Sequence, residues 1–91
     1  MITPRLKPSL DDEIAWYREY LPRQGFPFIV LTQPGQPHSY ARTKEMRVWL
    51  TERDPKPFAQ RGWNLRYCSA GIYCVGFRDQ ILATEFKIHF G

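Results

Sequence analysis

The final third of the chain, residues 63–90, constrains the fold most strongly because it has the densest apolar content in the sequence. Apolar and polar side chains alternate over residues 63–68, which is the period-two pattern of a strand with one buried face. Residues 72–77 are mainly β-branched and aromatic, as in a central strand that is covered on both sides. Between these segments, Gly71 can adopt the positive φ that a tight turn needs. The stretch therefore predicts a β-hairpin in the core.

The segment after this hairpin has two interpretations. Asp79 can cap a helix, and residues 79–85 suit a short one. In residues 86–90, large apolar side chains alternate with Lys87 and His89 as in a strand, but the apolar residues also follow helical spacing. We favour a helix of residues 79–85 followed by a terminal strand of residues 86–90, and one helix continuing to Phe90 is the alternative.

The N-terminal part of the chain predicts one helix and one strand. Ser9 and Asp12 have the spacing of a capping box, and apolar residues at helical spacing follow them, so a helix is expected over residues 10–21. Residues 26–32 are apolar and partly β-branched, which predicts a strand. Residues 1–8 contain two prolines and are expected to form an extended arm.

Residues 43–53 fit either a helix or a strand. We favour a helix because Lys, Glu, Met and Leu are good helix formers, and a strand is the alternative. Asp54 and Pro55 end the segment in either case. The order of the elements predicts one α+β domain over residues 1–91, with a small antiparallel sheet and two or three helices packed on one face.

Apolar runs in the sequence are short. None approaches the roughly 20 residues that a membrane-spanning helix needs, and the first residues lack the apolar segment of a signal peptide. We therefore expect a cytoplasmic protein without a membrane partner.

The two cysteines allow two states. Cys68 and Cys74 lie directly opposite each other if the hairpin turn centres on Gly71, which makes a cross-strand disulfide geometrically possible. We favour two free, largely buried thiols, as is usual in a reducing compartment.

Positive charge is concentrated in the middle of the chain. The formal net charge is +4, and residues 42–66 carry all of it, because this span has seven basic and three acidic residues whereas the rest of the chain has six of each. Tyrosine, tryptophan and phenylalanine are interleaved with the basic residues. The candidate partner-binding residues are Arg42, Lys44, Arg47, Trp49, Arg53, Lys56, Arg61 and Arg66.

Three interpretations of this basic, aromatic span remain open. Arginine and tryptophan are common anchors on an acidic protein surface. Cations with aromatic rings also suit the phosphates and stacked bases of DNA or RNA. The third interpretation is a solvated face with its aromatic residues in the core.

Catalytic signatures are absent from the sequence. There is no glycine-rich phosphate loop, no HExxH motif and no serine–histidine–aspartate pattern. The acidic run of residues 11–13 fits the first turn of a helix, where the helix dipole favours negative charge. We therefore expect no catalytic residue, no metal and no cofactor, and interpret His89 as a structural residue.

The end of the chain resembles the tail of small tailed-phage proteins. The resemblance rests on Phe77, Asp79 and Ala83, followed by the Phe-Lys-x-x-aromatic-Gly finish of residues 86–91. It implies a phage gene product that acts in the cytoplasm of a bacterial host, and it transfers no functional residue. Small proteins of this kind often bind and disable a host factor.

Together these features predict a non-enzymatic binding protein. We expect it to bind and to inhibit or modulate a host protein or nucleoprotein, for example as an anti-CRISPR-like inhibitor. The alternative is a direct DNA- or RNA-binding module that uses the basic, aromatic span of residues 42–66.

Overall fold

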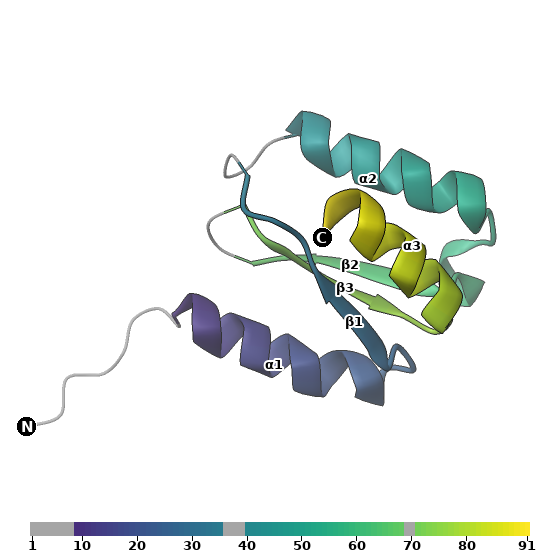
Figure 1. Ribbon diagram of the computed structural model, residues 1–91. Coiled ribbons are helices and arrows are strands. Elements are labelled where there is room, and N and C mark those ends of the chain that lie inside the picture. Colours follow the sequence, from purple (N-terminus) through teal and green to yellow (C-terminus); the bar gives the residue numbers. More distant parts are fainter. Residues whose placement is uncertain (1–8, 36–39, 69–70) are drawn as a thin grey trace, which may run out of the picture.

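The computed structural model describes residues 9–35, 40–68 and 71–91. Its elements in chain order are α1 (Leu10–Arg23), β1 (Phe28–Leu31), α2 (Tyr40–Arg53), the short 3-10 helix η1 (Phe58–Gln60), β2 (Trp63–Tyr67), β3 (Tyr73–Phe77) and α3 (Gln80–Phe90). The strands form one antiparallel sheet in the order β1-β3-β2 (Figure 1). The predicted α+β class is therefore confirmed. The expected arm of residues 1–8 lies outside the described residues.

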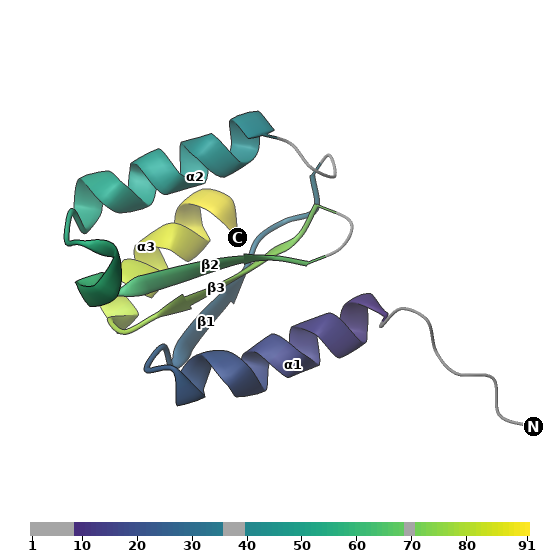
Figure 2. The same cartoon turned by 180° about the vertical axis from the view of Figure 1, so that it is seen from behind.

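Helices cover both faces of the sheet. Figures 1 and 2 show α2 and α3 together on one face and α1 on the other. The α2/α3 face holds the larger core, in which Met46, Leu50 and Phe86 pack on Val75 and Phe77. The α1 face holds a smaller core around Leu21, Phe26, Cys68 and Cys74. Two helices thus share one face as predicted, and the third covers the opposite face.

The central strand is β3, as the sequence indicates. All five of its residues are buried, because β1 and β2 flank it and helices cover its two faces. Val75 points to the α2/α3 core, whereas Cys74 and Gly76 lie on the α1 side. A Cβ atom at Gly76 would lie 2.8 Å from the Cβ atom of Phe26 and 3.3 Å from two side-chain atoms of Leu21. Glycine at this position therefore lets α1 approach the sheet closely.

Replacing this glycine tests how closely α1 packs. We expect Gly76→Ala to lower the free energy of unfolding by about 1–3 kcal/mol, the usual cost of forcing extra atoms into a packed core. Alanine loses less conformational entropy on folding than glycine, so a loose contact would instead give an equal or higher stability. Urea denaturation of the two proteins distinguishes these outcomes.

Helix α1 begins at the predicted residue and ends beyond the predicted one. The capping box is present, since the Ser9 side chain accepts from the Asp12 N–H and the Asp12 carboxylate accepts from the Ser9 N–H. The helix continues through Pro22 to Arg23, although proline cannot donate a backbone hydrogen bond to the carbonyl oxygen of Arg18. The chain then turns at Gly25, whose φ is 94°, and the Phe26 N–H donates to the Leu21 carbonyl oxygen.

The favoured terminal strand of residues 86–90 is wrong, and the alternative of one continuous helix is confirmed. Asp79 caps α3 as predicted by accepting from the Ile81 N–H, and the helix then runs to Phe90. Phe86 is fully buried, whereas Ile88 is 80% exposed, so these two residues do not share a buried strand face. The helix ends where the Gly91 N–H donates to the Lys87 carbonyl oxygen.

The favoured helix over residues 43–53 is confirmed, and it begins three residues earlier, at Tyr40. Met46, Trp49 and Leu50 are its buried residues. No helix within the described ranges is long and apolar enough to cross a bilayer.

The two cysteines are not opposite each other. Arg66 pairs with Cys74, and the Cys68 N–H donates to the Ile72 carbonyl oxygen, so the hairpin is centred one residue earlier than Gly71. Both thiols are free and buried on the α1 face. Burial raises the pKa of both, and together with the nearby Cys68 it raises the pKa of Cys74 to about 12.

Because the pKa values of both thiols are raised in the folded protein, we expect the free energy of unfolding to decrease at high pH. A thiol that titrates near 9.0 when unfolded and near 12 when folded stabilises the fold below pH 9 and loses that contribution as the pH rises toward 12. In this window we expect one such thiol to lower the free energy of unfolding by up to about 1.4 kcal/mol per pH unit. Because other groups also titrate here, the measurement compares urea denaturation of the wild type and Cys74→Ala from pH 8 to 11. Equal slopes would contradict the burial of the Cys74 thiol.

Candidate binding surface

Three arginines lie around β2, with Arg47 and Arg61 on the side of α2 and Arg66 on the side of α1. Arg47 is on an exposed face of α2, Arg61 precedes β2, and Arg66 is in β2. The Arg61 guanidinium lies 3.8 Å from the centre of the Trp63 ring, and its Nε donates to the Trp63 carbonyl oxygen at 3.1 Å. Trp63 is itself buried in the core, so it fixes the position of the Arg61 charge.

The charges of Arg47 and Arg66 both act on Arg61. Partial burial lowers the pKa of Arg61, and the positive charges of Arg47 and Arg66 lower it further, while Asp54 raises it. Arg66 lies on the α1 side of the sheet, where its guanidinium is 6.0 Å from the centre of the Tyr20 ring. We call Arg47, Arg61 and Arg66 the arginine cluster.

Acidic residues neutralise only part of the predicted patch. Among the described residues, neither Arg47 nor Arg66 nor Lys44 has a carboxylate oxygen within 4.0 Å. The Nε of Arg66 is also buried without a hydrogen-bond partner in that part of the chain. Within the described ranges, the charges of Arg47 and Arg66 are therefore available to an acidic partner.

A groove lies next to the cluster. It has a volume of about 360 Å³ and is lined by Tyr40, Thr43, Arg47, Leu65, Tyr67 and Tyr73. Tyr40 at the start of α2 is 79% exposed. A cation and an exposed aromatic ring thus face the same hollow, which a peptide or a base could enter.

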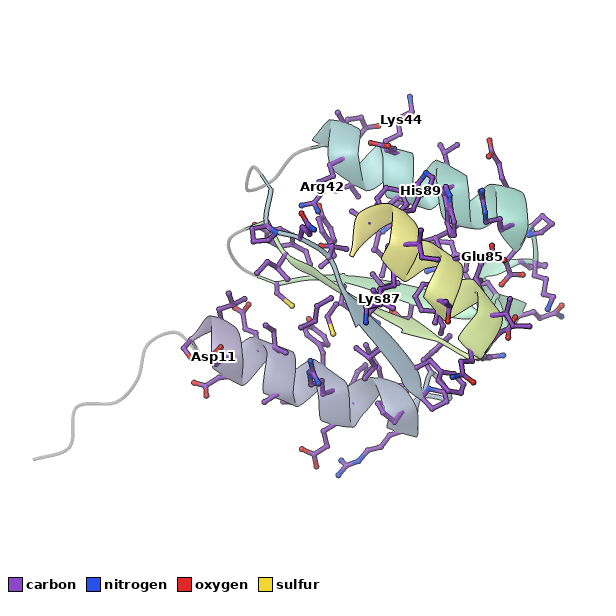
Figure 3. All side chains as sticks on the ribbon, in the orientation of Figure 1. Asp11, Arg42, Lys44, Glu85, Lys87 and His89 are labelled. Atoms are coloured by element: carbon purple, nitrogen blue, oxygen red, sulfur yellow. The ribbon has the colours of Figure 1, made fainter. Side chains whose placement is uncertain are left out.

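Arg42 is engaged in holding loops together. Its guanidinium donates to the carbonyl oxygen of Gly71 at 2.6 Å and also to that of Gln33. Figure 3 shows Arg42 near the loops at the start of α2, whereas Lys44 points away from the sheet into solvent. Arg42 therefore links α2 to the two segments that flank β1 and β3.

The remaining predicted residues lie toward the C-terminal end of α2. Arg53 packs over the Trp49 ring at 3.8 Å and lies 3.8 Å from Glu85, and Lys56 lies 4.0 Å from Asp54. Trp49 is only 8% exposed because its ring packs between α2 and α3. Trp49 is a core residue, and this corrects its placement on the docking surface.

The predicted patch therefore has three parts. The arginine cluster is one, Arg42 and Lys44 at the start of α2 are the second, and Arg53 with Lys56 near carboxylates is the third. Tyr40 was among the aromatic residues interleaved with the basic span but not among the eight candidate residues, and the backbone of β2 was not considered. The alternation of residues 63–68 predicted the strand but not its place at the edge of the sheet, which depends on strand order.

The acidic, histidine and cysteine side chains of the described residues are spread over the fold. Within the described ranges, no three His, Cys, Asp or Glu side chains are grouped so that they could hold a metal ion. His89 lies in the exposed last turn of α3, with its ring 5.6 Å from the Trp49 ring, and no bond from it to a carboxylate or a thiol occurs among the residues described.

Comparisons of the chain with family models, curated proteins and solved structures gave no match.

Proposed function

We propose that this chain is a non-enzymatic binding protein that docks its arginine cluster onto an acidic surface of another protein or nucleoprotein. The observation that supports the proposal is that Arg47 and Arg66 each lie close enough to Arg61 for their positive charges to repel its charge and lower its pKa. An acidic partner would relieve this repulsion and add attraction of its own, and such complementarity speeds association and fixes orientation. Guanidinium groups suit this role because they can bind carboxylates in a bidentate manner.

The resemblance to tailed-phage proteins implies that the protein acts inside a bacterial host. The partner is then a factor of the bacterial host, and binding inhibits or modulates it. A CRISPR-type effector is one specific candidate, since such a nucleoprotein combines acidic protein surfaces with nucleic-acid channels.

Affinity purification from a lysate of the native host tests this function. The tagged wild type is compared with Arg47→Glu/Arg61→Glu and with a control, Arg23→Glu/Lys87→Glu, that has the same net charge but leaves the cluster intact. We expect mass spectrometry to find one host protein or complex in stoichiometric amount with the wild type and the control, and to find it lost with the cluster variant. The absence of any stoichiometric partner, or equal capture by all three proteins, would contradict the proposal.

Direct nucleic-acid binding is the second candidate. It is favoured by Tyr40, which is exposed and lines a hollow on the outer face of α2 together with Lys44 and Arg47, so that a base could stack on the ring while cations contact phosphates. This candidate predicts that the logarithm of affinity for a thymidine oligonucleotide falls with the logarithm of salt concentration, by roughly 0.7 for each phosphate contacted. Fluorescence anisotropy that shows no binding at low salt would exclude it.

A further inference from the structure

Among the described strands, β2, the one nearest to the arginine cluster, has a neighbour on one side only. The sheet order β1-β3-β2 puts β3 on one side of β2, and no described strand pairs with its other side. Strands of this kind present backbone N–H and C=O groups that can pair with another chain. The chemistry of this edge therefore decides what can bind there.

The register identifies the backbone groups that face outward. The Cys68 N–H donates to the Ile72 carbonyl oxygen and the Arg78 N–H donates to the Gly62 carbonyl oxygen, so residues of even number in β2 bond to β3. In an antiparallel pair every second residue points its backbone groups to the other side. Leu65 thus directs its N–H and C=O away from β3, and no other described residue hydrogen-bonds to these two groups.

The opposite edge of the sheet is protected. Pro27 directly precedes β1, and beyond its end the Gln33 N–H donates to the Phe90 carbonyl oxygen of α3. The Gln33 side chain also donates to the Gly91 carbonyl oxygen. Proline and a covering helix are common means of blocking an edge strand. In the described chain, β2 has neither, and instead it has cations beside it.

These cations select the type of strand that can pair. Pairing of two copies through β2 would bring two arginine clusters together, and like charges at close range disfavour that arrangement. An acidic strand would instead bring carboxylates to the same arginines. Charge complementarity therefore favours an acidic segment of another protein over a second copy of this chain.

We propose that the β2 edge binds an extended acidic segment of the partner as an additional strand of the sheet, beside Arg47 and Arg61. The identity of the partner rests on the proposed function, whereas the binding mode rests on the edge itself. Backbone hydrogen bonds to Leu65 contribute affinity that does not depend on sequence, and grooves on either side of the strand provide specificity.

Side chains of the added strand alternate between two grooves. Those on the same face as Leu65 enter the groove that Arg47 and Tyr40 line. The charge of Arg47 favours acidic side chains at these positions. Those on the other face lie toward α1, where a groove is lined by aromatic rings and carboxylates: Asp12, Glu13, Trp16, Tyr17 and Tyr67. Arg66 also lies on this side, but the carboxylates of Asp12 and Glu13 line the groove itself, so acidic side chains are less favourable there than beside Arg47. The preferred sequence therefore alternates an acidic residue with an apolar one.

Synthetic peptides test the binding mode. The probe is a capped peptide of four Glu-Val repeats, and a matched peptide of four Lys-Val repeats controls for strand propensity. Two further Glu-Val peptides carry N-methyl groups on the Glu amides or on the Val amides. Because the amides of alternate residues face opposite sides of a strand, only one of these two series blocks pairing with β2.

We expect the Glu-Val peptide to bind the full chain and to slow exchange of the Leu65 amide hydrogen, as measured by NMR. Lys-Val, one of the two methylated series and the Arg47→Glu/Arg61→Glu variant should each bind about tenfold more weakly or worse. The other methylated peptide should bind the wild-type protein almost as tightly as the unmethylated Glu-Val peptide does. The control variant Arg23→Glu/Lys87→Glu should bind the unmethylated Glu-Val peptide almost as tightly as the wild type does.

Three results would overturn the inference. The first is no binding of the Glu-Val peptide, and the second is equal affinity of both methylated series without protection of the Leu65 amide. Capture of a host partner that depends on Arg47 and Arg61 would then leave the proposed function standing. The third is slow exchange of the Leu65 amide in the protein alone that increases with its concentration, since a second copy would then occupy the edge. Peptide binding without a captured host partner would instead contradict only the proposed function.

Discussion

Reversal of the charges of Arg47 and Arg61 together is expected to weaken the affinity for the captured partner by about 100-fold or more, which corresponds to about 2.8 kcal/mol of binding free energy. Each substitution removes an attraction and adds a repulsion at a carboxylate of the partner. Charged pairs that lose water on binding have coupling energies of about 1.5–7 kcal/mol, so two reversals reach this magnitude. Calorimetric titration of the wild type and the double variant measures the change.

The fold should remain intact in this variant. Arg47 is exposed, and the stacking of Arg61 on Trp63 contributes about 0.5–1 kcal/mol. We therefore expect the far-UV circular dichroism spectrum to be unchanged, with a decrease of the unfolding midpoint by a few degrees. The control variant Arg23→Glu/Lys87→Glu should keep the wild-type affinity. An equal loss of affinity in the control would show that net charge, and not the arginine cluster, controls binding.

Val75→Asp is expected to prevent folding. Val75 is fully buried at the centre of β3, where Leu65 of β2 and Val30 of β1 lie opposite it. A carboxylate at this position would lose its hydration without gaining a partner, which costs several kcal/mol, and the whole domain has only about 5–15 kcal/mol of stability. The far-UV circular dichroism spectrum should be that of an unfolded chain.

A matched substitution on the surface controls for the chemistry of that change. Val48 of α2 is 47% exposed, so Val48→Asp should alter the free energy of unfolding by only about 0.5 kcal/mol. Similar denaturation curves for the Val75→Asp and Val48→Asp proteins would show that the core is placed wrongly.

Local patterns in the sequence were sufficient for most of the fold. The alternation of residues 63–68 and the apolar run of residues 72–77 predicted the hairpin, because the pattern of apolar side chains in each strand indicates which of its faces are buried. The Ser9 and Asp12 capping box likewise predicted the start of α1. These features depend on neighbours in the chain, and no tertiary contact is needed to recognise them.

The terminal helix could not be distinguished locally from a strand. Phe86, Ile88 and Phe90 satisfy strand spacing, and the choice depends on whether Ile88 is buried. That depends on contacts with distant residues: Phe86 packs on Trp49 and Phe77, while Ile88 faces solvent. The cysteine register was missed for a similar reason, since a shift of the hairpin by one residue decides which residue lies opposite Cys68.

The binding surface was predictable in composition but not in shape. The excess of positive charge in residues 42–66 was visible in the sequence, yet the packing of α2 on the sheet decides that Arg47 lies near Arg61. The same packing buries Trp49 and separates Arg53 from the cluster. The open edge of β2 depends on strand order, which no local pattern contains.

Hydrogen–deuterium exchange of the full chain, with and without its captured partner, tests the docking surface most directly. The account predicts slower exchange on binding in the segment of β2 that contains Leu65 and in the part of α2 from Tyr40 to Arg47. Slower exchange confined to α1 or α3, with β2 unchanged, would contradict it.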